Sequence, residues 1–305
     1  MNITEKIKEH GIFGSSQKAF QLFSRLFSRK IQSAYYRWAV QDAPVYSNPT
    51  AAELEQIERD LTALGISVQD YSPASESFVK FQEAGYFPLN YHGGIDGPVW
   101  DEKLLEHWIA AERLGLMTWQ PENTYVDIAA CSSPWAKTLR DHFGLQAFAI
   151  DMGEVGNNYK ELPYYRVENA TATTFDDESI TGASLQCAYE MFMNQDDVNF
   201  VKEIARILKP GGKVVILPLY MHTHYCAYAT PEYYGKGYSD PNAKEYVRVD
   251  CFGVPSSRKY DAKTLKERVL DAVQNHGMHY QLLALRNKFD LGKDIYCHFI
   301  LEISK

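Results

Sequence analysis

The sequence has no apolar run of membrane-spanning length and no secretory signal at its start. Only five of its 305 residues are cysteines, and their spacing matches neither a disulfide framework nor a zinc pattern. Basic residues are also few, because 31 Lys and Arg stand against 39 Asp and Glu, a formal net charge of -8. A nucleic-acid partner, which requires a basic surface, is therefore disfavoured. We expect a cytoplasmic protein.

What the sequence does contain is a strand–turn–helix–strand pattern over residues 124–151. A β-rich run at residues 125–128 is followed by Ser133, a good helix N-cap, and by Pro134, which suits the first helical position. A second apolar strand is predicted at residues 145–150. This order is typical of a βαβ unit.

An acidic residue, Asp151, closes the second of these strands. In nucleoside-binding βαβ units an acid at this point accepts hydrogen bonds from the ribose hydroxyls. The helix that starts at Pro134 would also direct its free amides and positive dipole end at an anionic group. The segment therefore predicts a cofactor that carries a nucleoside.

Three more segments follow in order. They are Glu168–Ala170 after a third short strand, the stretch Asp176–Cys187, and ILKPGG at Ile207–Gly212 before another apolar strand. Together with Asp127–Ser133 and Asp151, this succession resembles the class I S-adenosylmethionine-dependent methyltransferases. Each motif is modest alone, and their order and spacing carry the resemblance.

The resemblance implies an α/β fold, a Rossmann-like seven-stranded methyltransferase sheet with an N-terminal helical accessory region. Residues 120–305 would form the methyltransferase domain, with Tyr280–Leu285 and Ile295–Ile303 as its closing strand pair. Residues 1–119 would form the accessory or cap region, and residues 218–260 a substrate insertion.

The implied cofactor is S-adenosyl-L-methionine. The turn after the first strand would lie near its methionine portion, Asp151 on the ribose, and Asn169 with Ala170 near the adenine. The residues expected to bind the cofactor are Asp127, Ala129, Ala130, Cys131, Ser132, Ser133, Asp151, Met152, Asn169, Ala170 and Cys187.

The first motif departs from the family pattern, because it is usually rich in glycine. Here Ala129, Cys131 and Ser133 occupy the matching positions. Small residues still allow a ligand to approach the backbone, so binding is expected with altered affinity. The alternative is a domain that has lost its ligand and serves as a non-catalytic scaffold.

Substrate residues are expected after the fourth and fifth strands, because ligands of open α/β sheets bind outside the carboxyl ends of the strands. The connection at residues 218–260 is much longer than the usual loop of about 4–6 residues and is rich in tyrosine. The substrate residues predicted at these positions are Tyr189, Glu190, Tyr220 and Arg258.

His222 and His224 are the predicted catalytic residues. Alternate positions in an extended segment put both side chains on one face, and either can take a proton from an acceptor hydroxyl. Two other roles stay open: a divalent metal site completed by Glu190 or Asp250, or a structural role. No metal is assigned.

Residues 18–40 form a basic segment with apolar side chains near helical spacing. Such a helix can contact an anionic membrane surface, associate with a second copy, or pack on the core of its own chain. A peripheral position at the inner face of a membrane is one expectation.

The sequence thus predicts a methyltransferase, with O-methylation of a small or sugar-containing acceptor. The SSPW turn and the ILPLY strand end are also similar to methyltransferase-like proteins of surface-glycan biosynthesis. The rival hypotheses are a non-catalytic binding protein of the same fold and an NAD-dependent dehydrogenase, which uses the same kind of βαβ unit.

Overall fold

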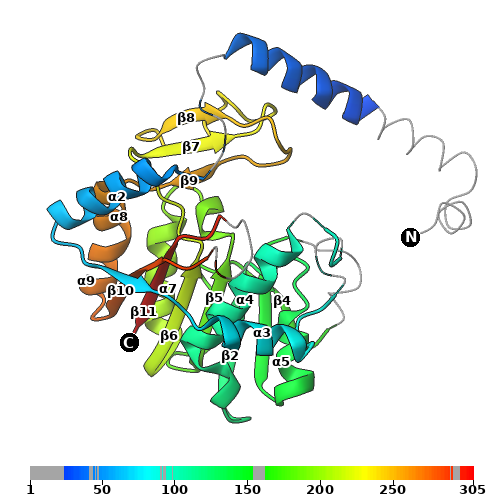
Figure 1. Cartoon of the computed structure of the whole chain (residues 1–305), viewed down its shortest axis with the longest axis vertical. Coiled ribbons are helices and arrows are strands. Elements are labelled where there is room, and N and C mark those ends of the chain that lie inside the picture. Colours follow the sequence, from blue (N-terminus) through cyan, green and yellow to red (C-terminus); the bar gives the residue numbers. More distant parts are fainter. Residues whose placement is uncertain are drawn as a thin grey trace, which may run out of the picture. The chain divides into compact units, whose positions relative to one another are not determined.

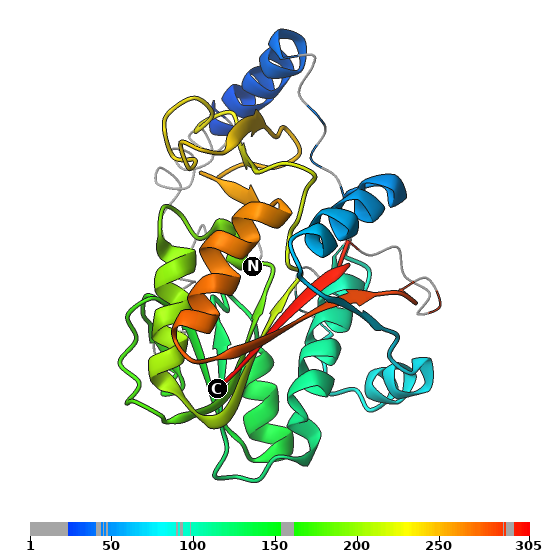
Figure 2. The same ribbon diagram turned by 90° about the vertical axis from the view of Figure 1, so that its left-hand side faces the viewer.

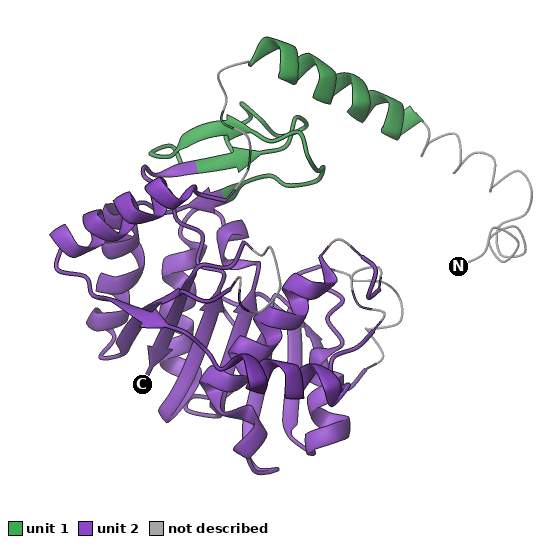
Figure 3. Cartoon of the chain, viewed as in Figure 1, with its two compact units in different colours: residues 1–47, 227–257 green, residues 48–226, 258–305 purple. Residues whose placement is uncertain are grey.

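The computed structural model describes residues 24–40, 44, 46, 48–89, 91, 94–97, 99–153, 162–288, 290 and 296–305. The chain divides into two compact units, residues 1–47 with 227–257 and residues 48–226 with 258–305 (Figure 3). The predicted domain boundary between residues 119 and 120 stays a prediction. Within the described residues, no helix combines the length and the apolar character that a membrane crossing requires.

An eight-stranded sheet forms the centre of the larger unit, in the order β1-β10-β11-β6-β5-β2-β3-β4 (Figure 1). The strands are β1 Val68–Tyr71, β2 Thr124–Ile128, β3 Gln146–Asp151, β4 Tyr165–Val167, β5 Ile180–Gln186, β6 Leu208–Leu217, β10 His279–Leu285 and β11 Phe299–Ser304. Only β11 runs antiparallel to its neighbours, β10 and β6, whereas the other adjacent pairs are parallel. The expected α/β class and closing strand pair are confirmed.

The sheet has one strand more than the seven predicted. Residues Val68–Tyr71, expected to belong to a helical accessory region, pair in parallel with β10 in the register Val68 to Leu282. This strand has only four residues, and Tyr71 alone is buried. A strand this short gives too little alternation to be recognised in the sequence.

Helices cover both faces of the sheet. They are α2 Ala51–Ala63, α3 Ser75–Glu83, α4 Trp100–Leu114, α5 Trp135–Phe143, α7 Asp196–Ile207, α8 Ala262–Leu265 and α9 Asp271–Asn275, with a π-helical turn, η4 Lys266–Leu270, joining the last two. The short 3-10 turns are η2 Leu116–Thr118 and η3 Tyr189–Met191. Figure 2 shows α7 beside the α8–α9 segment on one face and α4 on the other.

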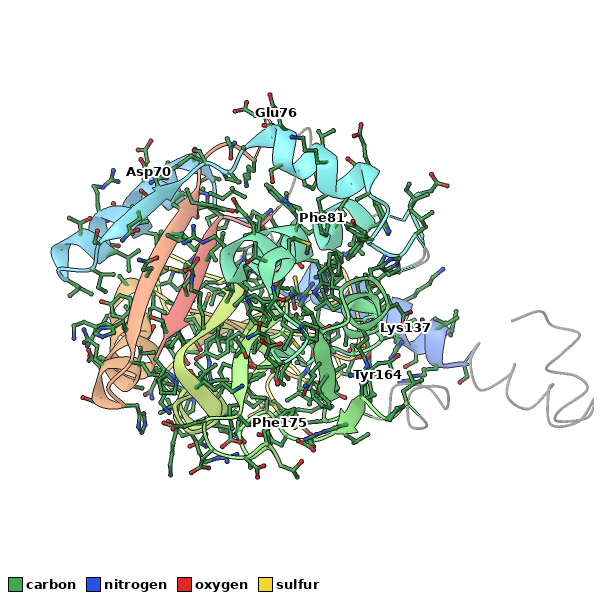
Figure 4. All side chains as sticks on the ribbon, turned by 90° about the horizontal axis from the view of Figure 1, so that it is seen from below. Asp70, Glu76, Phe81, Lys137, Tyr164 and Phe175 are labelled. Atoms are coloured by element: carbon green, nitrogen blue, oxygen red, sulfur yellow. The ribbon has the colours of Figure 1, made fainter. Side chains whose placement is uncertain are left out.

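Local signals set several helix ends. Thr50 forms a capping box with Glu53 at the start of α2. Helix α4 ends where Gly115 adopts a φ of 71°. Large side chains such as Trp108 and Trp135 fill the interior, while Asp70 and Glu76 lie at the periphery in Figure 4. The core thus packs α4 and α5 against the strands that carry the first motif.

The smaller unit contains a helix at residues 24–39 and most of a three-stranded sheet, order β8-β7-β9. Its strands are β7 Cys226–Ala229, β8 Lys244–Val247 and β9 Ser257–Lys259. The helix leaves five large apolar side chains exposed, Leu26, Phe27, Ile31, Tyr35 and Trp38. These residues therefore do not form part of a core, and residues 18–23 of the predicted segment lie outside the described residues.

Candidate cofactor and acceptor site

Two cavities adjoin at the turn that follows β2. The first has a volume of about 380 Å³ and is lined by residues that follow β2, β3, β4 and β5. The second, also about 380 Å³, lies between the same turn and α4. Ala129 and Cys131 line both. Both cavities therefore lie at the carboxyl ends of the strands, where open α/β sheets bind their ligands.

The turn itself keeps the backbone shape for which glycine is normally used. Ala129 has a φ of 54° and Cys131 a φ of 48°, both in the left-handed region. This conformation costs a non-glycine residue about 1–2 kcal/mol. It is held by hydrogen bonds from the Ala130 amide to the Ile150 carbonyl, 2.9 Å, and from the Cys131 amide to Asp151 Oδ2, 2.8 Å. The glycine-poor motif thus retains its geometry at the cost of strain.

Glycine should be tolerated at both strained positions. In Ala129→Gly and Cys131→Gly, relief of strain opposes the greater entropy of the unfolded chain, so we expect the free energy of unfolding to change by less than about 1 kcal/mol. Urea denaturation measures this change. Ala52→Gly on the exposed face of α2 is the control, with an expected loss of about 0.5–1 kcal/mol. If Ala129→Gly lowered the free energy of unfolding more than the control does, the backbone at Ala129 would not be strained.

Asp151 stands between the turn and the first cavity. Its Oδ2 accepts the Cys131 amide and its Oδ1 accepts the Gly153 amide, both at 2.8 Å. A carboxylate offers about four acceptor sites. The two amides therefore fix the carboxylate in place and leave acceptor capacity for the two hydroxyls of a ribose.

The rest of the first cavity is mostly apolar. Ala170, Ala188, Met191 and Phe192 form walls suited to a flat aromatic ring. Asn169 lines the cavity, and its Oδ1 accepts from the amide and the hydroxyl of Thr171, each at 2.9 Å. These bonds stabilise the turn and leave the amide nitrogen of Asn169 as the group that can donate to a base. Met191 and Phe192 were not predicted, although they directly follow the predicted Tyr189 and Glu190.

Asp127 lies in the second cavity with 1% of its surface exposed. Burial raises the pKa of its carboxyl to about 7, while hydrogen bonding from Ser133 opposes the shift. Within the described part of the chain, Asp127 Oδ2 has no hydrogen-bond partner. Buried carboxylate oxygens are normally satisfied, and a cationic donor such as an ammonium group would fit here.

A buried polar network forms the α4 side of this cavity. Lys103 Nζ lies 2.7 Å from Glu106 Oε2, and the Cys187 thiol donates to Glu106 Oε1 at 3.1 Å. Burial alone would lower the pKa of Lys103, but the adjacent Glu106 carboxylate raises it above its usual value. Burial raises the pKa of Cys187, which is therefore a neutral thiol. Tyr296 also contacts Cys187 and lies 3.3 Å from Lys103 Nζ.

His107, one turn after Lys103 on α4, lines the same cavity. Its Nδ1 is 2.7 Å from the Lys103 carbonyl oxygen. Because a carbonyl only accepts, Nδ1 carries the hydrogen, and the lone pair of the neutral ring lies on Nε2. The rings of Phe87 and Trp135 flank the imidazole, with centroids 5.1 and 5.5 Å away. The sequence did not single out this residue, although polar side chains at positions 103, 106 and 107 share one helix face.

The predicted cofactor residues are largely brought together. Those that line the cavities are Asp127, Ala129, Ala130, Cys131, Ser133, Asp151, Met152, Asn169, Ala170 and Cys187. Ser132 is half-buried within the same turn. Their roles toward a cofactor stay predictions.

The predicted substrate residues separate into two groups. The Tyr220 ring stacks on Tyr296, with centroids 5.8 Å apart, and thus contacts a residue of the second cavity. Glu190 is buried. Tyr189 donates to the Asp197 carbonyl, and Arg258, only 3% exposed, forms an ion pair with the Asp197 carboxylate. Tyr189 and Arg258 thus support the interior, and their role in substrate binding stays a prediction.

His222 and His224 lie together, with ring centroids 4.3 Å apart. Neither is among the described residues that line the two cavities. Burial, followed by the charges of His224 and Lys259, lowers the pKa of His222 to about 4. Their predicted role as a base therefore stays a prediction that the cavities do not support.

Comparison with known proteins gives a match to a family model. Residues 126–216 match the family model described as a methyltransferase domain. A search of curated proteins finds no match. Similar solved structures include geranyl diphosphate C-methyltransferase from Streptomyces coelicolor A3(2), 14% identical, with 76% of this chain and 99% of that one covered and a TM-score of 0.39. Another is a methyltransferase from Methanosarcina mazei, which is 15% identical. The match covers 61% of this chain and 92% of that one, with a TM-score of 0.36.

Proposed function

We propose that this chain, in which residues 126–216 match a methyltransferase domain, transfers a methyl group from S-adenosyl-L-methionine to a hydroxyl of a small or sugar-containing acceptor. The observation that supports the proposal most is the meeting of two cavities at the strained turn of Ala129–Cys131, beside the carboxylate of Asp151. One cavity is apolar and suits an adenine, whereas the other holds a buried acid and a polar network.

The residues present fit this cofactor. Asp151 would hold the ribose, Asn169 and Ala170 the adenine, and Asp127 with Ser133 the amino-acid portion. The carboxyl of Asp127 has a pKa near 7, so an ammonium group beside its oxygen Oδ2 would favour the ionised form. When bound, the cofactor supplies an electrophilic methyl group on a sulfonium.

The chain's own residues supply position and proton transfer. Cavity walls hold the acceptor near the turn, which accounts for much of the acceleration in a reaction between two bound molecules. His107 Nε2 would accept the acceptor's hydroxyl proton, because its ring is locked with Nδ1 protonated. The Lys103–Glu106 pair and Tyr296 would orient the acceptor through hydrogen bonds. The aromatic rings around His107 would limit the access of water.

The acceptor class rests on less specific features. The connection at residues 218–260 is long and rich in tyrosine, as expected of a loop that recognises a substrate. The helix at residues 24–39 combines exposed apolar residues with Arg25, Arg29, Lys30 and Arg37. Such a helix suits contact with an anionic membrane surface or with a second copy, and the former would bring the enzyme to membrane-linked glycan intermediates.

Calorimetric titration with S-adenosylhomocysteine and, separately, with NAD tests this function. We expect saturable binding of one S-adenosylhomocysteine per chain and no binding of NAD. Binding of NAD alone would favour a dehydrogenase. Binding of neither, by a folded chain, would favour a scaffold and contradict the proposal.

A further inference from the structure

A second group of chemically reactive side chains lies outside the two cavities. His222, His224 and Cys226 occupy alternate positions between the end of β6 and the start of β7, around a bend at residues 223–224. Their potential ligand atoms all lie within 4.8 Å of one another. All three belong to the larger unit. Two imidazoles and a thiol thus converge on one point.

From this convergence we propose that His222, His224 and Cys226 form a binding site for a divalent zinc ion. Zinc is borderline-soft and takes imidazole nitrogen at about 2.0–2.1 Å and thiolate sulfur at about 2.3 Å. Tetrahedral geometry would draw the three donors together by about 1 Å, which side-chain rotation can supply. The fourth position would be left to water or another small ligand.

The surroundings of the cluster suit metal binding. Thr223 Oγ1 lies 3.3 Å from Nδ1 of His222 and 3.4 Å from Nδ1 of His224. A contact of this kind orients metal-binding imidazoles, because the nitrogen that does not bind the metal usually forms a hydrogen bond. Of the charged groups near His222, Glu53 would attract the ion, whereas buried Lys259 would weaken its binding.

The backbone around the cluster is also anchored. The His222 amide donates to the Tyr260 carbonyl at 2.8 Å, and the Tyr260 amide donates to the Tyr220 carbonyl at 3.1 Å. These bonds join the start and the end of the long connection after β6. A zinc ion on His222, His224 and Cys226 would therefore fix the start of the connection in the same place.

The site differs from the one that the sequence left open. Glu190 or Asp250 was considered as the third ligand, whereas Cys226 now takes that position. The zinc site also gives His222 and His224 a role other than that of a base. Because the inference concerns metal binding, it can fail while the proposed methyl transfer holds, and the reverse is equally true.

The first test uses the untagged full chain, treated with a chelator and then titrated with Zn²⁺ alone. We expect one zinc per chain, with proton release from the Cys226 thiol. Titration with Co²⁺ should give a thiolate-to-cobalt charge-transfer band in the absorption spectrum. No saturable zinc binding, or a cobalt spectrum without the thiolate band, would overturn the site, and neither result depends on a variant that must fold.

Variants then identify the ligands. Cys226→Ser and His224→Gln should each weaken zinc binding at least about 10–100-fold, the loss usual even for groups that only support a metal ligand. Cys251→Ser and His276→Gln, which lie outside the cluster, are the matched controls. Full zinc affinity in the cluster variants, or an equal loss in the controls, would contradict the assignment.

Discussion

Asp151→Ala should weaken the binding of S-adenosylhomocysteine by about 1–3 kcal/mol, which is about 5- to 150-fold in the dissociation constant. The variant removes the carboxylate that we propose accepts two ribose hydroxyls at the end of β3. It also removes the partner of the Cys131 and Gly153 amides, which hold the turn. Calorimetry measures the affinity, and denaturation shows whether the variant is folded.

Two further variants separate these contributions. Asp151→Asn keeps one side-chain oxygen for a backbone amide but loses the charge. Its affinity for S-adenosylhomocysteine should therefore fall less than that of Asp151→Ala. Asp141→Ala removes an exposed acid from α5 that pairs with exposed Lys137. It should leave the affinity unchanged. An Asp151→Ala variant that is folded and binds as tightly as the original chain would remove Asp151 from the site.

Replacing His107 should have the largest effect on turnover. In His107→Gln we expect kcat to fall about 10²–10⁴-fold, the contribution usual for a positioned general base. The affinity for S-adenosylhomocysteine should stay nearly unchanged, because no cofactor group is assigned to the imidazole. The assay would follow S-adenosylhomocysteine release with a hydroxyl acceptor found by screening small and sugar-containing compounds.

The pH profile distinguishes a base from a structural residue. A base must be unprotonated, so kcat of the original chain should rise with pH over the range in which the base loses its proton and then level off. The rise should be absent in His107→Gln and present in His276→Gln, an exposed control. If His107→Gln kept full activity and His222→Gln or His224→Gln lost turnover, the base would be one of the two histidines predicted from the sequence.

The sequence was most informative where chemistry and chain order coincide. Asp151 could be predicted because it ends a strand in a βαβ unit, and the structure positions its carboxylate against the turn of Ala129–Cys131. The closing strands could be predicted from apolar runs. The left-handed φ of Ala129 and Cys131 agrees with the alignment of these residues to glycine positions.

What the sequence did not reveal depends on contacts between distant segments. His107 and Tyr296 lie far apart in the chain, and only folding brings them to one cavity. Glu106 is among the least exposed residues of α4, a position that a helical pattern reserves for apolar side chains. Its partner, Lys103, explains the exception. The sequence indicates no role for Cys226 beyond that of one of five cysteines, because its closeness to His222 depends on the bend at residues 223–224.

The proposed cofactor site is tested most directly by a crystal structure of the protein soaked with S-adenosylhomocysteine. We expect adenosine in the cavity of Asn169 and Phe192, with both ribose hydroxyls on Asp151, and the amino-acid portion beside Asp127 in the adjoining cavity. Density for the ligand elsewhere, or these two cavities closed by the protein's own side chains, would contradict it.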